Sequence, residues 1–190
     1  MARLPLLTAE TAPEAARERV TSVEKANGFL PNLIGLLANA PTALETYQTV
    51  SAINARAGLS VAEREAVQIT AAAIHGCGFC VAGHTILAYK KAGLTEDVVN
   101  ALRANARVPD ARLDAVATFT RAVIRSRGAV EDAELQAFKA AGFSDANALE
   151  VVLGVSLATL CNFANNLGQV PLNPQYEPYA WTPALATAAE

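Results

Sequence analysis

Aromatic residues, charges and basic segments are all scarce in this chain of 190 residues. Aromatic side chains make up 6% of it and charged side chains 17%, and its formal net charge is −3. The shortage of aromatic residues disfavours a fold built on β-strands. The shortage of basic residues removes the positive surface that binds a nucleic-acid backbone or an anionic membrane, so neither is an expected partner.

Long apolar runs are scarce as well, and we expect no secretory leader. The longest apolar run, residues 151–161, is interrupted by glycine, serine and threonine. It is well short of the roughly 20 residues that a membrane-spanning helix needs. The first residues contain Pro5 and Glu10 where a secretory signal would have its apolar core. We therefore expect a cytoplasmic protein without a membrane helix.

Alanine is abundant, at 41 of the 190 residues, and hydrophobic residues make up 52% of the chain. This is enough for one core, and it favours helices. Prolines precede the alanine-rich runs and glycines end them, as at helix termini, and Ser60 followed by Glu63 predicts a capping box. We predict a single all-α domain over residues 1–190. The expected helices span residues 13–27, 32–39, 41–57, 60–75, 78–92, 95–105, 110–127, 131–141 and 144–167.

The two ends of the chain differ from this helical body. Residues 1–12 form a short segment before the first expected helix. Residues 171–190 contain four of the nine prolines together with Tyr176, Tyr179 and Trp181. Proline at this density excludes an α-helix, whereas three large aromatic side chains are not expected to remain in water. We predict an extended tail packed on the body or on a neighbouring subunit; the alternative is a frayed terminus.

The three cysteines are Cys77, Cys80 and Cys161. Their odd number and the missing secretory signal argue against a disulfide framework, and close cysteine pairs in a reducing compartment are typically redox-active or metal-binding. Cys77 and Cys80 are three positions apart, a spacing at which a reversible disulfide can close. Cys161 lies in an apolar run and is expected to be a buried core residue.

The residues around the pair predict how it is placed. Gly76 and Gly78 flank Cys77, so one helix should end before Gly76 and the next should begin near Gly78. Both cysteines then lie at a helix start, where free amides and the macrodipole lower a thiol pKa. His84 shares the helix face of Cys80, four residues on, and could relay a proton. Cys80 is therefore predicted to be the better-activated thiol.

Glu65 belongs to the preceding predicted helix, where Ala66, Val67 and Ile69 give it an apolar setting. A buried carboxylate there could accept and return a proton. The alternative is an ordinary solvated glutamate, because acidic side chains are rarely buried without a partner.

Other chemistries of the pair fit less well. Zinc could take His75, Cys77, Cys80 and His84, but ligands spread over the end of one helix and two turns of the next converge poorly on a tetrahedral site. A c-type haem needs a histidine directly after the second cysteine, where Val81 stands, and a thioredoxin-like site needs a preceding strand. The remaining prediction is a helical thiol-redox site that uses no metal and no cofactor.

The order Glu65, Cys77, Cys80, His84 resembles the E-x11-C-x2-C-x3-H signature of AhpD-like alkylhydroperoxidases in the carboxymuconolactone decarboxylase superfamily. The resemblance implies an all-helical fold, homo-oligomers that are commonly trimers or hexamers, and reduction of a small hydroperoxide. It also implies that Cys80 is the peroxidatic thiol, that Cys77 resolves it, and that Glu65 and His84 relay protons. The implied reductant is a dithiol of the lipoyl or thioredoxin type.

Three further features qualify the resemblance. Residues 27–32 are also similar to the peroxidase-related branch of the family. Phe79 stands where characterised AhpD proteins carry an additional histidine, which shortens the expected proton relay. An offset of 85 positions suggests an internal duplication, because it maps the four site residues onto Glu150, Asn162, Asn165 and Gln169.

Three hypotheses of function are therefore carried forward, of which the third is a zinc-stabilised helical module that predicts stoichiometric metal. The first is a thiol-dependent peroxidase that works through a disulfide between Cys77 and Cys80. The second is a non-catalytic redox-sensing or interaction protein, in which the same disulfide changes contacts with partners or with other copies.

Overall fold

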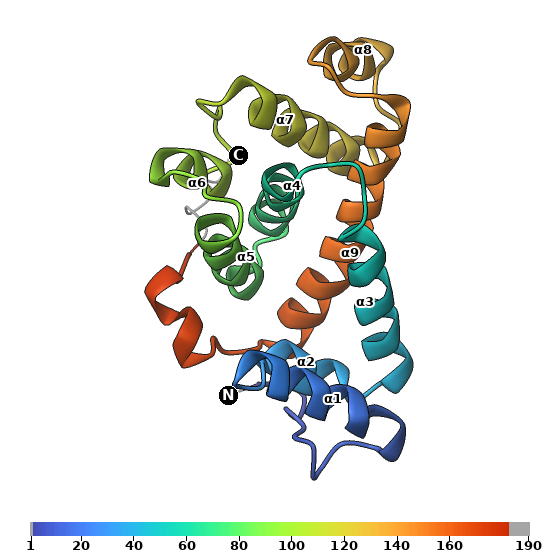
Figure 1. Ribbon diagram of the computed structural model, residues 1–190, viewed down its shortest axis with the longest axis vertical. Helices are drawn as coiled ribbons and strands as arrows, with labels where there is room; N and C mark the ends of the chain where they lie inside the picture. Colours follow the sequence, from blue (N-terminus) through green and yellow to red (C-terminus); the bar gives the residue numbers. More distant parts are fainter. Residues whose placement is uncertain (1, 183–190) are drawn as a thin grey trace, which may run out of the picture.

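The computed structural model describes residues 2–182 and contains helices but no strands over that range (Figure 1). The all-α prediction is confirmed, and each expected helix is present with its ends shifted by a few residues at most. The elements are α1 (Glu14–Asn27), α2 (Asn32–Leu37), α3 (Pro41–Asn54), α4 (Val61–Ile74), α5 (Gly78–Lys90), α6 (Glu96–Arg103), α7 (Ala111–Ser126), α8 (Asp132–Ala140), α9 (Asp145–Gly168) and the 3₁₀ helix η1 (Pro174–Tyr179).

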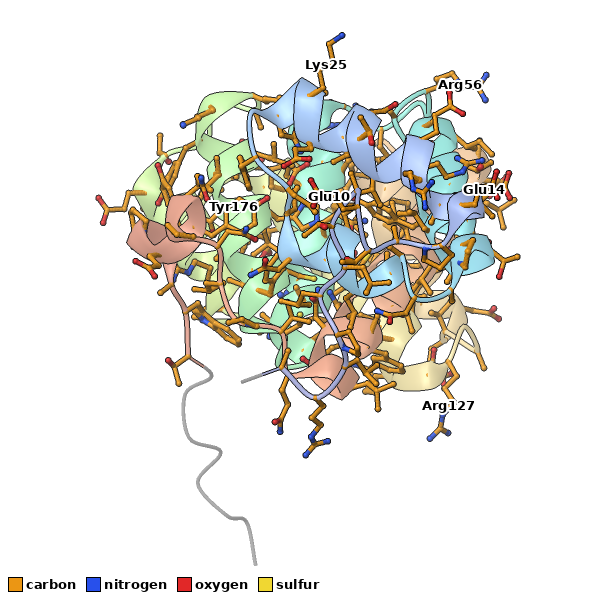
Figure 2. All side chains as sticks on the ribbon, turned by 90° about the horizontal axis from the view of Figure 1, so that it is seen from below. Glu10, Glu14, Lys25, Arg56, Arg127 and Tyr176 are labelled. Atoms are coloured by element: carbon orange, nitrogen blue, oxygen red, sulfur yellow. The ribbon has the colours of Figure 1, made fainter. Side chains whose placement is uncertain are left out.

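Helix α4 lies at the centre and is packed against α5, α6, α7 and α9 (Figure 1). Almost every residue from Glu63 to Ala73 is buried. One apolar cluster, which includes Ile69, Val116 and Phe138, joins α4 to α7 and α8. A second cluster joins α4, α5 and α9 to α1–α3 and contains all three cysteines. Charged side chains such as Lys25 and Arg127 project outward from the body (Figure 2).

Polar contacts at the start of α4 fix its position. The predicted capping box is confirmed: the Ser60 hydroxyl accepts from the Glu63 amide, and the Glu63 carboxylate accepts from the Ser60 amide at 2.6 Å. The Glu150 carboxylate of α9 accepts from the amides of Gly58 and Leu59 at 2.6 and 3.1 Å. The loop before α4 is therefore held by α9, which satisfies amides that would otherwise lack a partner.

The helix break around the cysteine pair is where the sequence predicts it. His75 caps the end of α4, Gly76 adopts a left-handed conformation with φ of 67°, and Cys77 is the residue that caps the start of α5. A side chain at Gly78 would come within 2.9 Å of the Trp181 carbonyl oxygen, so the C-terminal segment also requires a glycine here.

The C-terminal segment, residues 171–182, packs on the body. Tyr176, labelled in Figure 2, lies edge-on against Phe29 and Phe79, and Tyr179 lies against Tyr89. The prediction of a wholly extended tail is wrong, because Pro174–Tyr179 forms a 3₁₀ helix. Proline is tolerated at the first position of such a short turn, where no amide donor is needed. Residues 183–190 of the predicted tail lie outside the described residues.

Helix α9 is long and apolar enough, by length and composition alone, to cross a membrane. The sequence prediction considered only uninterrupted apolar runs, whereas α9 spreads a few polar residues over 24 positions. A core helix of a soluble protein passes the same test, and α9 packs against α2, α3, α4, α5, α7 and α8. The finding is weak evidence, so the absence of a membrane helix stays a prediction.

The closest approach of α4 and α9 yields a stability prediction. A Cβ added at Gly154 would lie 2.9 Å from a methyl carbon of Val67, which is buried and branched and cannot move aside. We expect Gly154→Ala to lower the free energy of unfolding by about 1–3 kcal/mol through overpacking, measured by urea denaturation. Gly83→Ala on α5 is the matched control, because its Cβ would meet Tyr176 at an ordinary 3.9 Å. Equal stability of the two variants would contradict the prediction.

Candidate active site

The two sulfurs of the cysteine pair lie at the start of α5 as free, buried thiols. Cys77 is 1% exposed and Cys80 is 5% exposed. Cys77 caps the helix, and Cys80 follows in its first turn. A helix start offers unpaired amides and the positive end of the macrodipole to both residues, as the sequence predicts.

The pair does not share its negative charge equally. The Cys80 thiol donates to the Cys77 sulfur and lowers the pKa of Cys77; burial opposes this shift, and the amides of Cys80 and Phe79 and the nearby His84 support it. The same hydrogen bond, together with burial and the closeness of Cys77, raises the pKa of Cys80 well above its usual range. The hydrogen bond favours negative charge on Cys77 in the resting pair, because Cys77 caps the helix and Cys80 acts as its donor, and the greater activation of Cys80 stays a prediction.

Glu65 and His84 form a direct ion pair between α4 and α5. The Nδ1 atom of His84 lies 2.7 Å from Oε2 of Glu65, whose side chain is 11% exposed. Burial disfavours the charged imidazole, but the Glu65 carboxylate outweighs it and raises the pKa of His84, with a smaller contribution from Cys77. Glu65 is thus buried and paired, not a solvated surface residue. His84 is held by the carboxylate and lies close enough to Cys77 to interact with it electrostatically.

A cavity of about 720 Å³ lies beside these groups, bounded mainly by α1, α3 and α5. Cys80 and His84 line it, whereas Cys77 and Glu65 do not. Most other lining side chains are apolar or aromatic, and Lys90 and Lys91 lie at its exposed side. A ligand in this cavity would meet the sulfur of Cys80 before that of Cys77.

Cys161 also lines this cavity. It is 6% exposed, in agreement with its predicted burial, and burial is the main cause that raises its pKa to about 12. Its thiol is therefore kept protonated at neutral pH. Its position beside Cys80 was not predicted, because the two residues are far apart in the sequence.

Several functional side chains come from elements that the sequence reading did not connect to the pair. Asn165 of α9 donates to the Cys80 sulfur at 3.2 Å, and Asn162 lies 3.0 Å from Nδ1 of His75. Tyr47 of α3 lines the cavity, and burial, with the nearby Cys161 and Cys80, raises its pKa above the usual range, so its phenol stays neutral. One sequence signal pointed to the two asparagines: the offset of 85 positions maps Cys77 and Cys80 onto Asn162 and Asn165. It did not show which side chains these asparagines contact.

The zinc alternative and the proposed duplication can now be compared with the geometry. His75 faces Asn162 and His84 faces Glu65, and residues 2–182 contain no group of three or more Cys, His, Asp or Glu side chains placed to hold a metal. The first half breaks its helix at Gly76, whereas α9 runs unbroken through the corresponding positions. The helix break at Gly76 therefore has no counterpart at the corresponding positions of α9, and the duplication stays a hypothesis.

Fold and site together define an all-α protein of the AhpD-like type, with a cysteine pair at a helix start. Residues 40–123, which are 84 of the 190 residues, match the model of the carboxymuconolactone decarboxylase family. No protein among the curated sequences matches the chain.

Solved structures extend the likeness to most of the chain. An uncharacterized peroxidase-related protein from Ralstonia eutropha JMP134, described as an alkylhydroperoxidase AhpD core, is 25% identical with a TM-score of 0.80, over 92% of this chain and 94% of that one. A peroxidase-related protein from Silicibacter sp. TM1040 is 20% identical with a TM-score of 0.80, over 92% and 93%. The debrominase Bmp8 is 16% identical with a TM-score of 0.71, over 92% and 94%. Since one fold includes proteins described in such different terms, it does not by itself decide the reaction.

The Glu65–His84 pair predicts a pH dependence. Its contribution to stability is complete below the unfolded histidine pKa of about 6.5 and is lost as the pH rises through the raised pKa of folded His84. We expect Glu65→Gln to lower the pKa of His84 and to destabilise the protein by about 1–3 kcal/mol at pH 6, with a smaller effect at high pH. NMR titration of His84 and urea unfolding at several pH values measure the two effects. An unchanged His84 titration in the variant would contradict the assignment.

Proposed function

We propose that the protein is a thiol-dependent peroxidase that reduces organic hydroperoxides through a disulfide between Cys77 and Cys80. The observation that carries this proposal is the shared cavity wall: Cys80 and the Glu65-paired His84 face the same space, with a second free thiol hydrogen-bonded behind Cys80. The cavity supplies access, His84 supplies a proton, and Cys77 supplies a second sulfur.

The first step oxidises Cys80. Its proton passes to the Cys77 sulfur, and the Cys80 thiolate attacks the outer oxygen of the hydroperoxide. The O–O bond breaks, a sulfenic acid forms on Cys80, and the alkoxide takes a proton from the charged His84 and leaves as an alcohol. The raised pKa of His84 supports this role, because a charged imidazole is the form that can donate.

The second step closes the disulfide. The Cys77 sulfur attacks the sulfur of the sulfenic acid, the S–O bond breaks, and the departing oxygen leaves as water with the proton that Cys77 gives up. Together the two steps consume one hydroperoxide and two thiols and give one alcohol, one water and one disulfide. A dithiol of the lipoyl or thioredoxin type would then return the pair to its reduced state.

The size and lining of the cavity favour an organic hydroperoxide over hydrogen peroxide. A space of about 720 Å³ with Phe29, Phe79 and Leu157 on its wall can bury an apolar group of the substrate, which hydrogen peroxide lacks. We expect kcat/KM for cumene hydroperoxide to exceed that for hydrogen peroxide by at least about tenfold, because burying part of the ring gains more than about 1.4 kcal/mol. Equal values for the two peroxides would contradict a role for the cavity.

Thiol counting after oxidation tests the proposed cycle. One equivalent of hydroperoxide should remove two thiols per chain, from Cys77 and Cys80, and leave Cys161 reduced. Cys80→Ser should lose turnover completely. Cys77→Ser should be oxidised once and then stop, with a sulfenic acid that dimedone traps. Turnover by Cys80→Ser at the wild-type rate would refute the proposal.

The redox-sensing alternative uses the same disulfide but predicts different results. It requires a large change in molecular size or partner binding on oxidation, with negligible peroxide turnover. Light scattering of reduced and oxidised protein, run beside the turnover assay, separates the two functions.

The expected homo-oligomer, a trimer or hexamer, has a candidate contact surface on α9. Leu149 and Leu167 are 71% and 64% exposed, and Val152 and Phe163 are also exposed along this helix. We propose that a second copy covers these side chains, since large apolar side chains gathered on one helix mark association surfaces. The double substitution Leu149→Glu and Leu167→Glu should lower the mass measured in solution, with helical content unchanged. An unchanged mass would place the contact elsewhere.

A further inference from the structure

The sulfur of Cys80 is contacted from outside the cysteine pair by a side-chain amide of α9. Nδ2 of Asn165 lies 3.2 Å from Sγ of Cys80. Asn165 is 3% exposed, and its Oδ1 atom has no hydrogen-bond partner among residues 2–182. A buried amide with one unsatisfied atom is costly, so its placement calls for an explanation beyond packing.

A second amide lies one turn earlier on the same helix. Asn162 is 1% exposed, its Oδ1 atom lies 3.0 Å from Nδ1 of His75, and its side chain acts to lower the pKa of Cys80. The end of α9 is itself held in place, because Asn166 donates to the His75 carbonyl at 2.8 Å. The amide of Asn165 therefore meets the sulfur from a fixed direction.

In the proposed first step, negative charge has to move from the Cys77 sulfur to the Cys80 sulfur, and a side-chain amide can stabilise it there. At rest, negative charge is favoured on Cys77, because Cys77 caps α5 and Cys80 donates to it. The sulfur that faces the cavity is Cys80, so charge must move there before attack. A buried thiolate that has given up its own proton needs a hydrogen-bond donor in place of water, and donors to charged groups are the strong ones.

We propose that Asn165, supported by Asn162, is a further catalytic residue, whose amide stabilises the negative charge on the Cys80 sulfur when the proton moves to Cys77. The same amide stays in contact with the sulfur as the sulfenic acid forms. The charge transfer needs no reagent beyond the two thiols, and the hydroperoxide is the oxidant. The inference rests on the proposed role of Cys80 as the attacking sulfur.

The test isolates the Cys80 sulfur. In the double variant Cys77→Ser, Cys161→Ala, Cys80 is the only thiol, and the pH dependence of its alkylation by iodoacetamide reports its ionisation. Adding Asn165→Leu, which keeps the size and removes the donor, should shift this profile upward by about one pH unit or more and slow alkylation at pH 7 by about tenfold or more. Adding Asn100→Leu, the same substitution at an exposed position of α6, should leave the profile unchanged. An unshifted profile in the Asn165→Leu protein overturns the proposal.

A second pair of variants keeps the test decisive if leucine prevents folding. Asn165→Gln and Asn165→Met are close in size but differ in the amide donor, so the glutamine variant should retain the lower titration midpoint. Identical midpoints for the two overturn the proposal.

Alkylation is also independent of peroxide turnover. A shifted profile with no turnover in the wild-type protein would support the amide contact while refuting the proposed peroxidase. Normal turnover of the wild-type protein, with an unshifted profile in the Asn165→Leu protein, would support the proposed peroxidase and refute the role of the amide.

Discussion

The close packing of α4 against α9 is the constraint on which the rest of the structure depends. At Gly154 the two helices approach so closely that no side chain fits, and Gln68 of α4 donates to the Gly154 carbonyl at 2.9 Å. This contact fixes the rotation and height of α9. Further along α9, Asn162 and Asn165 are thereby brought to the point where α4 ends and α5 begins, and at its other end Glu150 holds the loop that starts α4.

The helix break after α4 positions the side chains of the candidate site. Because the chain stops being helical for only a few residues, α5 starts beside the end of α4 and brings His84 back to Glu65. The two cysteines then meet free amides in a space from which water is largely excluded. Electrostatic effects are strong in such a place, so the hydrogen bond between the two thiols lowers the pKa of one and raises that of the other.

Much of the fold was predictable because helix signals are local. Proline, glycine and capping residues lie next to the helix ends that they define, so the nine expected α-helices were found near their expected bounds. The spacing of Cys77, Cys80 and His84 was similarly readable, since all three lie on one helix and its cap. The 3₁₀ turn at Pro174–Tyr179 was missed, because proline content excludes a long helix but does not exclude a short one.

The sequence by itself determined the helical class, the helix break and the placement of the cysteine pair at that break, because these depend on residues a few positions apart. Only the tertiary structure decided how the charge is divided between Cys77 and Cys80, which of them faces the cavity, and which side chains surround them. Those properties depend on Glu65, Asn165 and Tyr47, which come from three different helices. Burial and hydrogen bonding set a thiol's ionisation, and neither exists until distant segments pack together.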